Sequence, residues 1–419
     1  MIHGTSVLPR RTQPGRAGKS CHIVIGITSP QTCMVLTGRL RALREAGFRV
    51  TLLCSPGPLA EQVAREEGIE LVTVPMERSI APLQDIRACF RIWKILIHHA
   101  PDLVEFSTPK AGLLGMIAAW FARVPRRVYL LRGLRLESTH GFKRWLLLQT
   151  ERLASACAHT VVCNSVSLRC EVEDLRIGAP EKLTVLGAGS SRGVDTDHFS
   201  PGNSEVRFQY GIHPHAPVIG FVGRLTRDKG LPELLVAFNA ILKSHPDAHL
   251  LLVGWFDESD DAIDRVMRQR IESHPRILCT GYVNDPAPHY RAMDLFVLPT
   301  WREGFPNAVL EAAATGLPAI TTLCTGARDA VVPEVTGLLV PPGYPEAISE
   351  AAIRLLNNRN ERTRMGNAAR AWVLDHFVDR HILSLTVSFY RGMLGIERGG
   401  IDILSAPQAA VMDSASASQ

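Results

Sequence analysis

The stretch Thr300-Trp-Arg-Glu-Gly-Phe-Pro-Asn-Ala-Val-Leu-Glu-Ala-Ala-Ala-Thr-Gly-Leu-Pro318 joins a predicted strand to a short predicted helix. The strand covers the apolar run 295–298 and ends at Pro299. The helix is expected to have Pro306 at its first position and Gly316 at its C-terminal cap. Because residues 308–314 are apolar on nearly every side of such a helix, we expect the helix to be buried.

Glu311 is the exception within this helix. Burying a carboxylate costs several kcal/mol unless the group is hydrogen-bonded or paired, so we expect partners for Glu311. Glu303 precedes it in the loop before the helix. The two carboxylates can face one cleft, beside a helix N-terminus that favours anions.

Apolar runs of strand length alternate with helical patterns on both sides of this stretch. The first series covers 22–162, where Val35 to Ala46 reads as its first helix, and the second covers 218–357. A Gly- and Ser-rich passage, 187–194, separates them. The pattern predicts an α/β protein with two Rossmann-like domains facing across a central cleft, where ligands bind at the carboxyl ends of the strands.

The predicted domain limits follow from these series. Residues 21–194 form the first Rossmann-like domain and 195–375 the second, and 376–404 form a C-terminal helix that packs back on the first domain. The polar ends, 1–20 and 405–419, are expected to be disordered.

Charge is distributed unevenly along the 419 residues. The net charge is +5, yet residues 1–150 carry 21 Lys and Arg against 10 Asp and Glu. A basic first part indicates an acidic partner, which can be an anionic membrane, a diphosphate-bearing substrate or nucleic acid.

The nine cysteines are scattered without a Cys-x-x-Cys pair, and no histidines cluster at zinc spacing. This usage fits a reducing cytosol and argues against a metal site. The first twenty residues lack the apolar core of a signal peptide. The best candidate for a membrane span, Gly112 to Ala122, is far shorter than the roughly 20 residues that a bilayer requires. We therefore expect a cytoplasmic protein that does not cross the membrane.

Two cations follow the first strand of the second series. Arg224 stands in Gly223-Arg-Leu225, and Lys229 comes just before the next helix. Two cations beside a helix N-terminus suit a diphosphate, although they can also be solvated loop residues. Because Glu303 and Glu311 lie at another strand end of the same predicted sheet, we favour the diphosphate.

These motifs together resemble the family 4 retaining glycosyltransferases, which have the GT-B fold. The resemblance is carried by Phe221-Val-Gly-Arg-Leu225 with Lys229-Gly230, by Leu251-Leu-Val-Gly254, by Glu303-Gly-Phe-Pro-Asn-Ala-Val-Leu-Glu311 and by Thr336-Gly-Leu-Leu-Val-Pro341. Earlier in the chain, Thr108-Pro-Lys-Ala-Gly-Leu-Leu-Gly115, Arg132-Gly-Leu134 and Gly193-Val-Asp195 resemble the subgroup that builds capsular and other surface polysaccharides.

The resemblance implies roles for matching positions. Arg224 and Lys229 would hold the donor diphosphate, Glu303 would contact the donor sugar, and Glu311 would accept hydrogen bonds from the ribose. The remaining donor-binding positions are Gly223, Gly304 and the backbone around Phe305, Asn307 and Ala308, with Val283 near the base. The implied reaction proceeds with retention, without a protein nucleophile and without a metal or another cofactor. Asp195-x-Asp197 looks like a metal motif of another glycosyltransferase fold, but its place in the linker favours a structural role.

The acceptor side departs from the family pattern at one position. Many relatives have a histidine near the transferred sugar where this chain has Arg132. Arg132 can contact a phosphate of donor or acceptor, or can brace its loop. Lys110, Arg135 and His140 are further candidates for acceptor or phosphate contacts.

Two stretches, 87–97 and 143–148, mix cations with aromatic residues at helical spacing. They can lie on an anionic membrane surface, or they can be core helices with a basic solvated edge. The subgroup's acceptors are saccharides on polyprenyl diphosphate, so we favour a peripheral position on the inner face of the plasma membrane. Nucleic acid is not an expected partner, because no binding motif is present.

The leading hypothesis is thus a glycosyltransferase that uses a nucleotide sugar, expected to be UDP-linked, and a lipid-linked saccharide acceptor. Two alternatives remain open. One is a nucleotide-sugar epimerase or phosphorylase of the same fold, and the other is a non-catalytic subunit that binds a nucleotide sugar.

Overall fold

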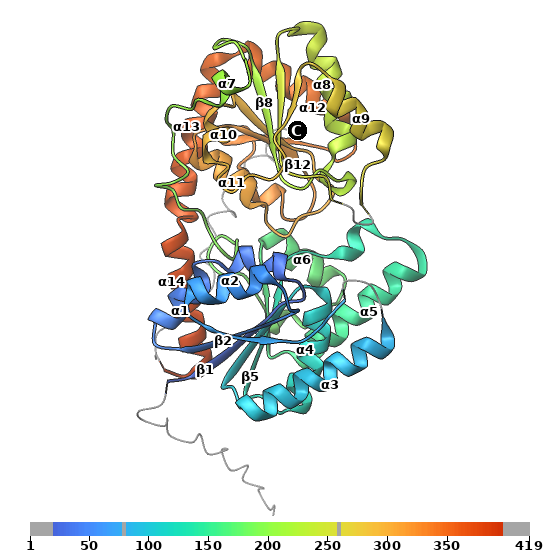
Figure 1. Cartoon of the computed structure of the whole chain (residues 1–419), viewed down its shortest axis with the longest axis vertical. Helices are drawn as coiled ribbons and strands as arrows, with labels where there is room; N and C mark the ends of the chain where they lie inside the picture. Colours follow the sequence, from blue (N-terminus) through green and yellow to red (C-terminus); the bar gives the residue numbers. More distant parts are fainter. Residues whose placement is uncertain (1–19, 78–80, 258–260, 397–419) are drawn as a thin grey trace, which may run out of the picture.

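The computed structural model describes residues 20–77, 81–257 and 261–396. Apart from Ser20, the two tails that we expected to be disordered lie outside the described residues, as does the end of the predicted C-terminal helix segment. The described chain forms two α/β units stacked along the long axis of the molecule (Figure 1).

The first unit is built on a seven-stranded sheet in the order β3-β2-β1-β4-β5-β6-β7, in which every pairing is parallel. Its central strands β1 and β4 are buried along their whole length, which explains why most of their residues are apolar. The strands are β1 (His22–Gly26), β2 (Arg49–Cys54), β3 (Glu70–Thr73), β4 (Leu103–Ser107), β5 (Arg126–Leu131), β6 (Thr160–Cys163) and β7 (Leu183–Thr184).

Helices cover both faces of this sheet. One buried cluster joins the sheet to α3, α4, α5 and α6, and another joins it to α1, α2 and the last described helix, α14. Their bounds are α1 (Arg39–Glu45), α2 (Pro58–Glu67), α3 (Pro82–His99), α4 (Pro109–Phe121), α5 (Gly141–Cys157), α6 (Val166–Asp174) and α14 (Asp379–Leu394), with 3₁₀ turns η1 (Pro30–Leu36), η2 (Arg135–Ser138) and η3 (Pro180–Lys182).

The second unit has a six-stranded parallel sheet in the order β10-β9-β8-β11-β12-β13. Its strands are β8 (Val218–Val222), β9 (His249–Val253), β10 (Ile277–Cys279), β11 (Leu295–Leu298), β12 (Ala319–Thr322) and β13 (Gly337–Val340). Its helices are α7 (Val206–Gln209), α8 (Leu231–Ser244), α9 (Arg265–Ser273), α10 (Ala287–Arg291), α11 (Asn307–Ala314), α12 (Pro345–Asn357) and α13 (Arg359–His376), with 3₁₀ turns η4 (Arg227–Lys229) and η5 (Arg328–Ala330). Two parallel Rossmann-like sheets in one chain give the expected GT-B class.

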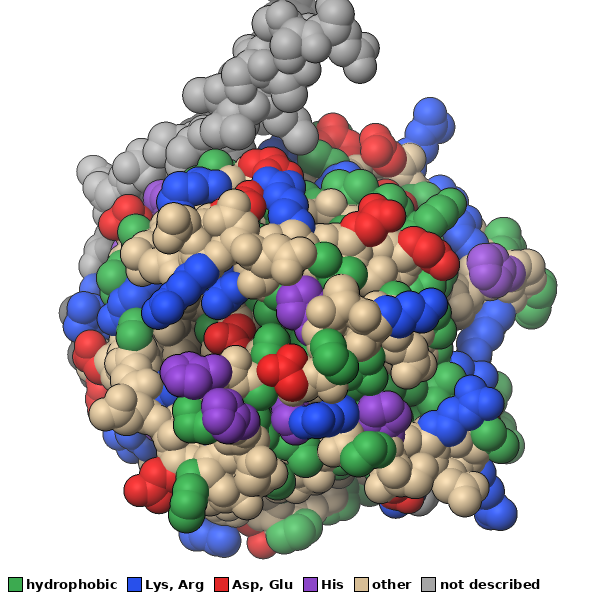
Figure 2. Space-filling model, turned by 90° about the horizontal axis from the view of Figure 1, so that it is seen from above, with side chains coloured by type: hydrophobic (Ala, Val, Ile, Leu, Met, Phe, Trp, Pro, Cys, Tyr) green, Lys and Arg blue, Asp and Glu red, His purple; other side chains and the backbone are tan. Residues whose placement is uncertain are grey.

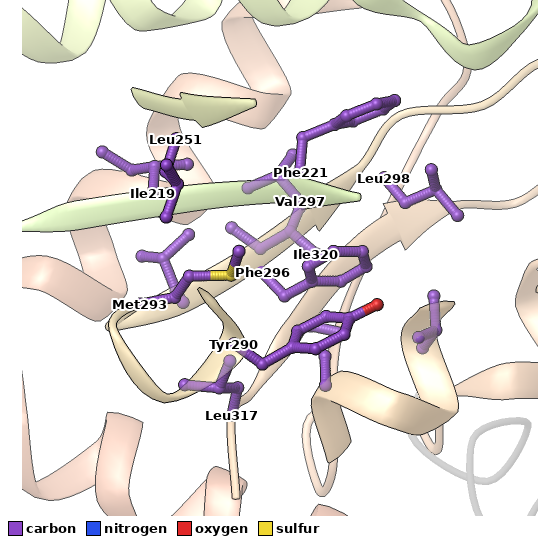
Figure 3. Packing of buried hydrophobic residues seen from close by; sticks show 14 of the residues in the cluster. Ile219, Phe221, Leu251, Tyr290, Met293, Phe296, Val297, Leu298, Leu317 and Ile320 are labelled. Atoms are coloured by element: carbon purple, nitrogen blue, oxygen red, sulfur yellow. The ribbon is translucent and has the colours of Figure 1, made fainter. Parts of the chain in front are cut away.

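The core of the second unit is packed between sheet and helices. Figure 3 shows Tyr290 from α10 lying beneath β11, among Met293, Phe296 and Leu317. The ring of Tyr290 is fully buried, and its hydroxyl is the only polar atom of its side chain. A buried hydroxyl requires a partner, and this one finds it on α11.

The end of the second unit that points away from the first unit has a mixed surface of charged, polar and apolar side chains (Figure 2). Figure 2 views the molecule from this end, where basic, acidic and histidine side chains are interspersed with apolar ones. Such a mixed surface is typical of a solvated face.

Within the described residues the chain passes between the two units twice, and the two crossings pair with each other. Val194 forms a parallel bridge with Val378, through Val194 N–H to Phe377 O at 2.8 Å and Asp379 N–H to Val194 O at 3.0 Å. Gly193 has φ +71, and a Cβ there would lie 2.7 Å from Phe377 O. The second crossing then leads into α14, whose side chains Phe389 and Tyr390 belong to the core of the first unit.

One predicted helix differs from the structure. Val35 to Ala46 is not continuous, because η1 ends at Leu36 and α1 begins at Arg39. Gly38 separates them with φ +79, a conformation outside the helical region. The predicted apolar helix is confirmed as α11, but Pro306 is its N-cap and not its first residue, and Thr315, not Gly316, is its C-cap. Among the described helices, none has the length and apolar character needed to span a bilayer.

Candidate active site

Each sheet has a switch point, where the strand order reverses between β1 and β4 and between β8 and β11. Loops that follow these or adjacent strands meet around one cavity, as expected for open parallel sheets. The cavity is lined from the first unit by Thr108, Pro109 and 129–135, and from the second by Arg224, Asp228, Lys229, Arg302, Glu303 and Gly304.

The two units touch at this cavity through backbone. A Cβ on Gly304 would lie 1.7 Å from Arg132 O, and one on Gly133 would lie 3.1 Å from Gly304 N. Gly133 also has φ +133, which disfavours other residues. Glycine at both positions therefore allows the loops after β5 and β11 to approach closely.

The cations of the loop after β8 are paired with carboxylates. The Arg224 guanidinium donates to Asp257 Oδ2 at 2.6 Å and lies 3.6 Å from Asp228 Oδ2, while Lys229 Nζ donates to Glu303. Burial alone would lower the pKa of Arg224, but the bond to Asp257 and the nearby carboxylates raise it. Gly223, which has φ +151, allows the turn that directs this loop toward the cavity.

Asp228 connects this loop to the loop after β11. Its buried carboxylate accepts from Thr226 Oγ1 at 2.5 Å and from Arg302 Nη2 at 2.8 Å, and its carbonyl accepts from Trp301 N–H at 2.9 Å. Burial works to raise the pKa of Asp228, but Thr226 and the three surrounding cations lower it overall. Asp228 thus fixes Arg224 and Arg302 around one anion.

Glu311 lies on the buried side of α11 and not on the cavity wall. Its carboxylate accepts from Arg192 Nη2 at 2.9 Å and from Tyr290 OH at 3.0 Å, which confirms the expectation that it would be paired. Burial raises the pKa of Glu311, while Arg192 and Tyr290 oppose that rise. Arg192 comes from the first interdomain crossing, so this crossing contributes directly to the surroundings of Glu311.

Most of the other candidate donor-binding residues lie at or beside the start of α11. Asn307 Oδ1 accepts from Ser190 Oγ at 3.2 Å, and Ala308 O accepts from Tyr290 OH at 3.2 Å. The buried ring of Phe305 lies 5.2 Å from that of Phe377, between ring centroids. Val283 packs partly buried against the second core, after β10.

The four candidate acceptor residues have different positions. Arg132 and Arg135 line the cavity, whereas Lys110 donates to Asp85 Oδ1 at 2.7 Å and His140 is exposed as the N-cap of α5. Arg132 Nη1 donates to Ser191 Oγ at 2.7 Å, and its Nη2 is buried with no hydrogen-bond partner among the described residues. Burial lowers the pKa of Arg132 to about 10, so this side chain remains a cation at neutral pH.

Two acidic groups sit at the interface beside the cavity. Asp329 from η5 accepts from the Ser167 amide at 3.3 Å and from its hydroxyl, at the N-terminus of α6. Glu137 from η2 faces the second unit, where burial raises its pKa to about 7 despite Thr325, Arg302 and Arg328. Each carboxylate thus lies against residues of the other unit.

The linker motif Asp195-x-Asp197 has the structural role that we favoured. Asp195 Oδ1 accepts from the amides of Asp197 at 3.1 Å and His198 at 3.0 Å, which stabilises a turn. Within the described residues, only His22, Glu70 and His99 are grouped closely enough to hold a metal ion. That group lies at the amino ends of the first strands, away from the cavity, and Glu70 pairs with Arg49 at 2.9 Å.

Three residues near the site were not predicted from the sequence: Arg192, Asp228 and Arg302. Asp228 and Arg302 each adjoin a predicted site residue, and a charged residue beside such a motif was an available signal. Arg192 was not recognisable, because its partner Glu311 is 119 residues away in the chain.

Comparisons with known proteins match both units. Residues 216–358 match the family described as glycosyl transferases group 1, and residues 35–189 match the glycosyl transferase 4-like domain. The capsular polysaccharide biosynthesis glycosyltransferase CapM of Staphylococcus aureus is 33% identical over 89% of this chain and 97% of its own length. An Escherichia coli UDP-Gal:alpha-D-GlcNAc-diphosphoundecaprenol alpha-1,3-galactosyltransferase is 28% identical over 81% of this chain and 90% of its own.

Solved structures share the fold. Anabaena HepE, crystallised with UDP and glucose, has a TM-score of 0.71 at 20% identity and covers 88% of this chain and 98% of its own. Sucrose-phosphate synthase from Thermosynechococcus elongatus has a TM-score of 0.74 at 21% identity, over 90% of this chain and all of its own. At these identities the likeness supports the GT-B fold alone.

Proposed function

The chain belongs to the family 4 glycosyltransferases of capsular polysaccharide biosynthesis, and on that premise we propose that it transfers a sugar from a UDP-sugar to a polyprenyl-diphosphate-linked saccharide. The observation that carries this proposal is the cavity in which Arg224, Lys229 and Glu303 of one unit face Arg132 and Arg135 of the other. The cavity thus offers cations for phosphates and a carboxylate for sugar hydroxyls.

The donor assignment rests on the second unit. Arg224 and Lys229 at a strand end suit a diphosphate, and the buried carboxylate of Glu311, in the middle of α11, suits the ribose hydroxyls. Relatives support uridine as the nucleoside, because the Escherichia coli enzyme is named for UDP-Gal and HepE was crystallised with UDP. A bound diphosphate would compete with Glu303 for Lys229, which frees the Glu303 carboxylate for the sugar.

The proposed reaction retains the anomeric configuration and uses neither a protein nucleophile nor a metal. The acceptor hydroxyl attacks the anomeric carbon on the face from which the diphosphate leaves. The bond from that carbon to the diphosphate oxygen breaks, the new glycosidic bond forms, and the hydroxyl proton passes to a phosphate oxygen. Arg224 and Lys229 stabilise the negative charge that develops on the leaving group.

Substitution of the donor contacts tests the assignment. Lys229→Ala should lower kcat by roughly 10²–10³, because it removes one preorganised contact to the leaving group. Glu311→Ala should mainly raise the KM for the donor. Lys243→Ala is the matched control, since Lys243 is exposed on α8 and outside the cavity. Folding of each variant is checked by thermal melting; full transfer activity in both site variants would contradict the proposal.

The acceptor and stereochemistry require a second experiment. Lipid-diphosphate saccharides are incubated with a panel of UDP-sugars, and the anomer of each product is determined by NMR. We expect an α-linked product from an α-linked donor. Conversion of UDP-GlcNAc to N-acetylmannosamine products without any acceptor would instead favour the epimerase.

We also propose that α3 and α5 place the protein on the inner face of the plasma membrane. These helices lie with α4 on one side of the first sheet (Figure 1). Helix α3 buries Ala88, Ile92 and Leu96 in the core, yet Leu83 remains 75% exposed and Ile86 67% exposed on another face. Burial in the core therefore does not account for these apolar residues.

Aromatic and basic residues extend this face. Phe142 and Trp145 of α5 are exposed and stacked with their ring centroids 5.5 Å apart, and Lys94 lies 4.6 Å from the Phe90 ring. Exposed aromatic residues beside cations suit the interface of an anionic bilayer.

Vesicle co-sedimentation tests this surface. The protein should bind vesicles containing phosphatidylglycerol, and binding should weaken with salt. The double variant Phe142→Ser/Trp145→Ser should reduce binding, whereas Phe208→Ser, which alters an aromatic residue 88% exposed in the second unit, should not. Equal binding by all three proteins would contradict this placement.

A further inference from the structure

We propose that Arg302 is the cation that binds the diphosphate of the lipid-linked acceptor, and that Asp228 positions it. This inference rests on the proposed function. Arg302 lies directly before Glu303 in the loop after β11, and its side chain, 22% exposed, lines the cavity.

The guanidinium of Arg302 is held on one side only. Its Nη2 donates to Asp228 Oδ2 at 2.8 Å and lies within 3.4 Å of Asp261 Oδ2, and both carboxylates belong to the second unit. Its Nε is buried and has no hydrogen-bond partner among the residues that the structure describes. The group is therefore fixed in place while part of its donor capacity remains unused.

The charge of the cavity exceeds what one diphosphate requires. Five cationic side chains line it, Arg132, Arg135, Arg224, Lys229 and Arg302, against the carboxylates of Asp228 and Glu303. A diphosphate diester carries one negative charge on each phosphoryl group. These lining side chains carry a net charge of +3, so a donor diphosphate bound at Arg224 and Lys229 leaves positive charge in the cavity, with Arg302 among the cations that the donor does not use.

The position of Arg302 favours the acceptor over the donor. The first unit lines the opposite wall of the cavity with Thr108, Pro109 and 129–135, and Gly304 approaches Arg132 and Gly133 through backbone. Arg302 is also close enough to Glu137 of the first unit to influence its pKa. A diphosphate at Arg302 would therefore lie between the two units, where an acceptor must enter.

Paired acceptors test the assignment. Initial rates are measured with one saccharide attached either to a lipid diphosphate or, as a neutral glycoside, to an alkyl chain of equal length. Arg302→Ala should raise the KM for the diphosphate acceptor about 10- to 100-fold, the range for losing a hydrogen bond to a charged group. The same variant should change the KM for the neutral acceptor and for the donor less than about twofold.

Further variants separate charge from structure. Arg302→Lys should restore part of the loss, and Asp228→Asn should also raise the KM for the diphosphate acceptor by releasing the guanidinium. Arg270→Ala, exposed on α9 and outside the cavity, is the matched control. Equal losses on both acceptors, or a loss confined to the donor KM, would overturn the proposal.

A binding measurement remains informative if the wild-type protein transfers no sugar. With the donor site saturated by UDP, inorganic pyrophosphate is titrated calorimetrically into wild-type protein and into Arg302→Ala. We expect a second binding event that is lost in the variant. If the wild-type protein shows that event without transfer, the proposed function fails and the Arg302 site stands; if the event persists in the variant, the site fails.

Discussion

Glu311 illustrates how one buried residue depends on distant parts of the chain. Its carboxylate is held by Arg192 from the interdomain crossing and by Tyr290 from α10. Arg192 opposes the rise in the pKa of Glu311 that burial causes. The ionised carboxylate is the form that accepts hydrogen bonds, so under the proposed function Arg192 would affect donor binding through Glu311.

Arg192→Ala should therefore raise the donor KM by about tenfold, comparable to the loss of one charge-assisted hydrogen bond. Because the residue is expected to position Glu311 and not to contact the leaving group, kcat should change much less. Steady-state kinetics give this comparison, with Arg192→Lys as the conservative variant. A fall of about tenfold in kcat with an unchanged donor KM would show that Arg192 does not act through donor binding.

Glu151 is a buried carboxylate with no role in the proposed reaction. It accepts from Tyr129 OH at 2.5 Å, and burial raises its pKa from 4.5 to about 7. A carboxyl whose pKa is raised by folding holds its proton more tightly in the folded state. Ionisation of Glu151 therefore makes the folded state less stable, so the free energy of unfolding falls as pH rises from about 4.5 to 7. Above pH 7 this loss of stability no longer changes with pH.

Glu151→Gln should remove this pH dependence while keeping an oxygen that can accept from Tyr129. Urea unfolding at pH 5, 6, 7 and 8 should show the variant gaining stability relative to wild type as pH increases to 7. A difference that is the same at every pH would mean that Glu151 does not titrate in this range.

Two glycines in helix α4 allow it to pack closely against strands β4 and β5. A Cβ on Gly115 would lie 2.1 Å from the Phe106 ring, and one on Gly112 would lie 2.3 Å from the Tyr129 ring. The two glycines therefore let α4 lie against the large side chains of β4 and β5.

Gly115→Ala places two effects in opposition. Alanine favours a helix over glycine by about 1 kcal/mol, whereas overpacking a core costs about 1–3 kcal/mol. At a separation of 2.1 Å we expect overpacking to dominate, with a net loss of about 1–2 kcal/mol in urea unfolding. Phe106→Leu makes room for the methyl group, so the double variant should lose less than the sum of the single losses.

The helices and strands were largely predictable from the sequence, because both sheets are parallel and their strands are short apolar runs. The exception after residue 30 arose because an apolar pattern does not distinguish one helix from a 3₁₀ turn and a helix separated by Gly38. At the site, motif positions placed Arg224, Lys229 and Glu303 near one cavity. The side chain of Glu311 was harder to place, because its direction depends on tertiary contacts.

At the scale of the whole molecule, two carboxylates, Glu137 and Asp329, lie in the contact between the units beside the cavity. Burial raises the pKa of Glu137 to about 7, with Glu171 raising it further, while Thr325, Arg302 and Arg328 lower it. Burial likewise raises the pKa of Asp329, which caps α6 through Ser167. Separation of the units would return both groups to solvent.

Closure of the two units should therefore weaken as pH rises from about 4.5 to 7, because ionised Glu137 is less stable in the interface than in water. Small-angle X-ray scattering at pH 5.5 and 8 should give a larger radius of gyration at the higher pH. Glu137→Gln should remove most of this difference. Identical scattering curves for wild type at both pH values would contradict the prediction.

The return of α14 to the first unit has a consequence for the order of events during synthesis on the ribosome. Tyr390 of α14 is fully buried against the ion pair between Arg39 and Glu105, which measures 2.5 Å. Tyr390 is translated 285 residues after Glu105, which corresponds to roughly 15–60 s at a rate of about 5–20 residues per second. Throughout that interval the nascent first domain lacks the helix that covers this charged pair. The core of the first unit is thus completed only when α14 has been synthesised. A nascent chain stalled after α13 would present an incompletely covered core to chaperones and proteases.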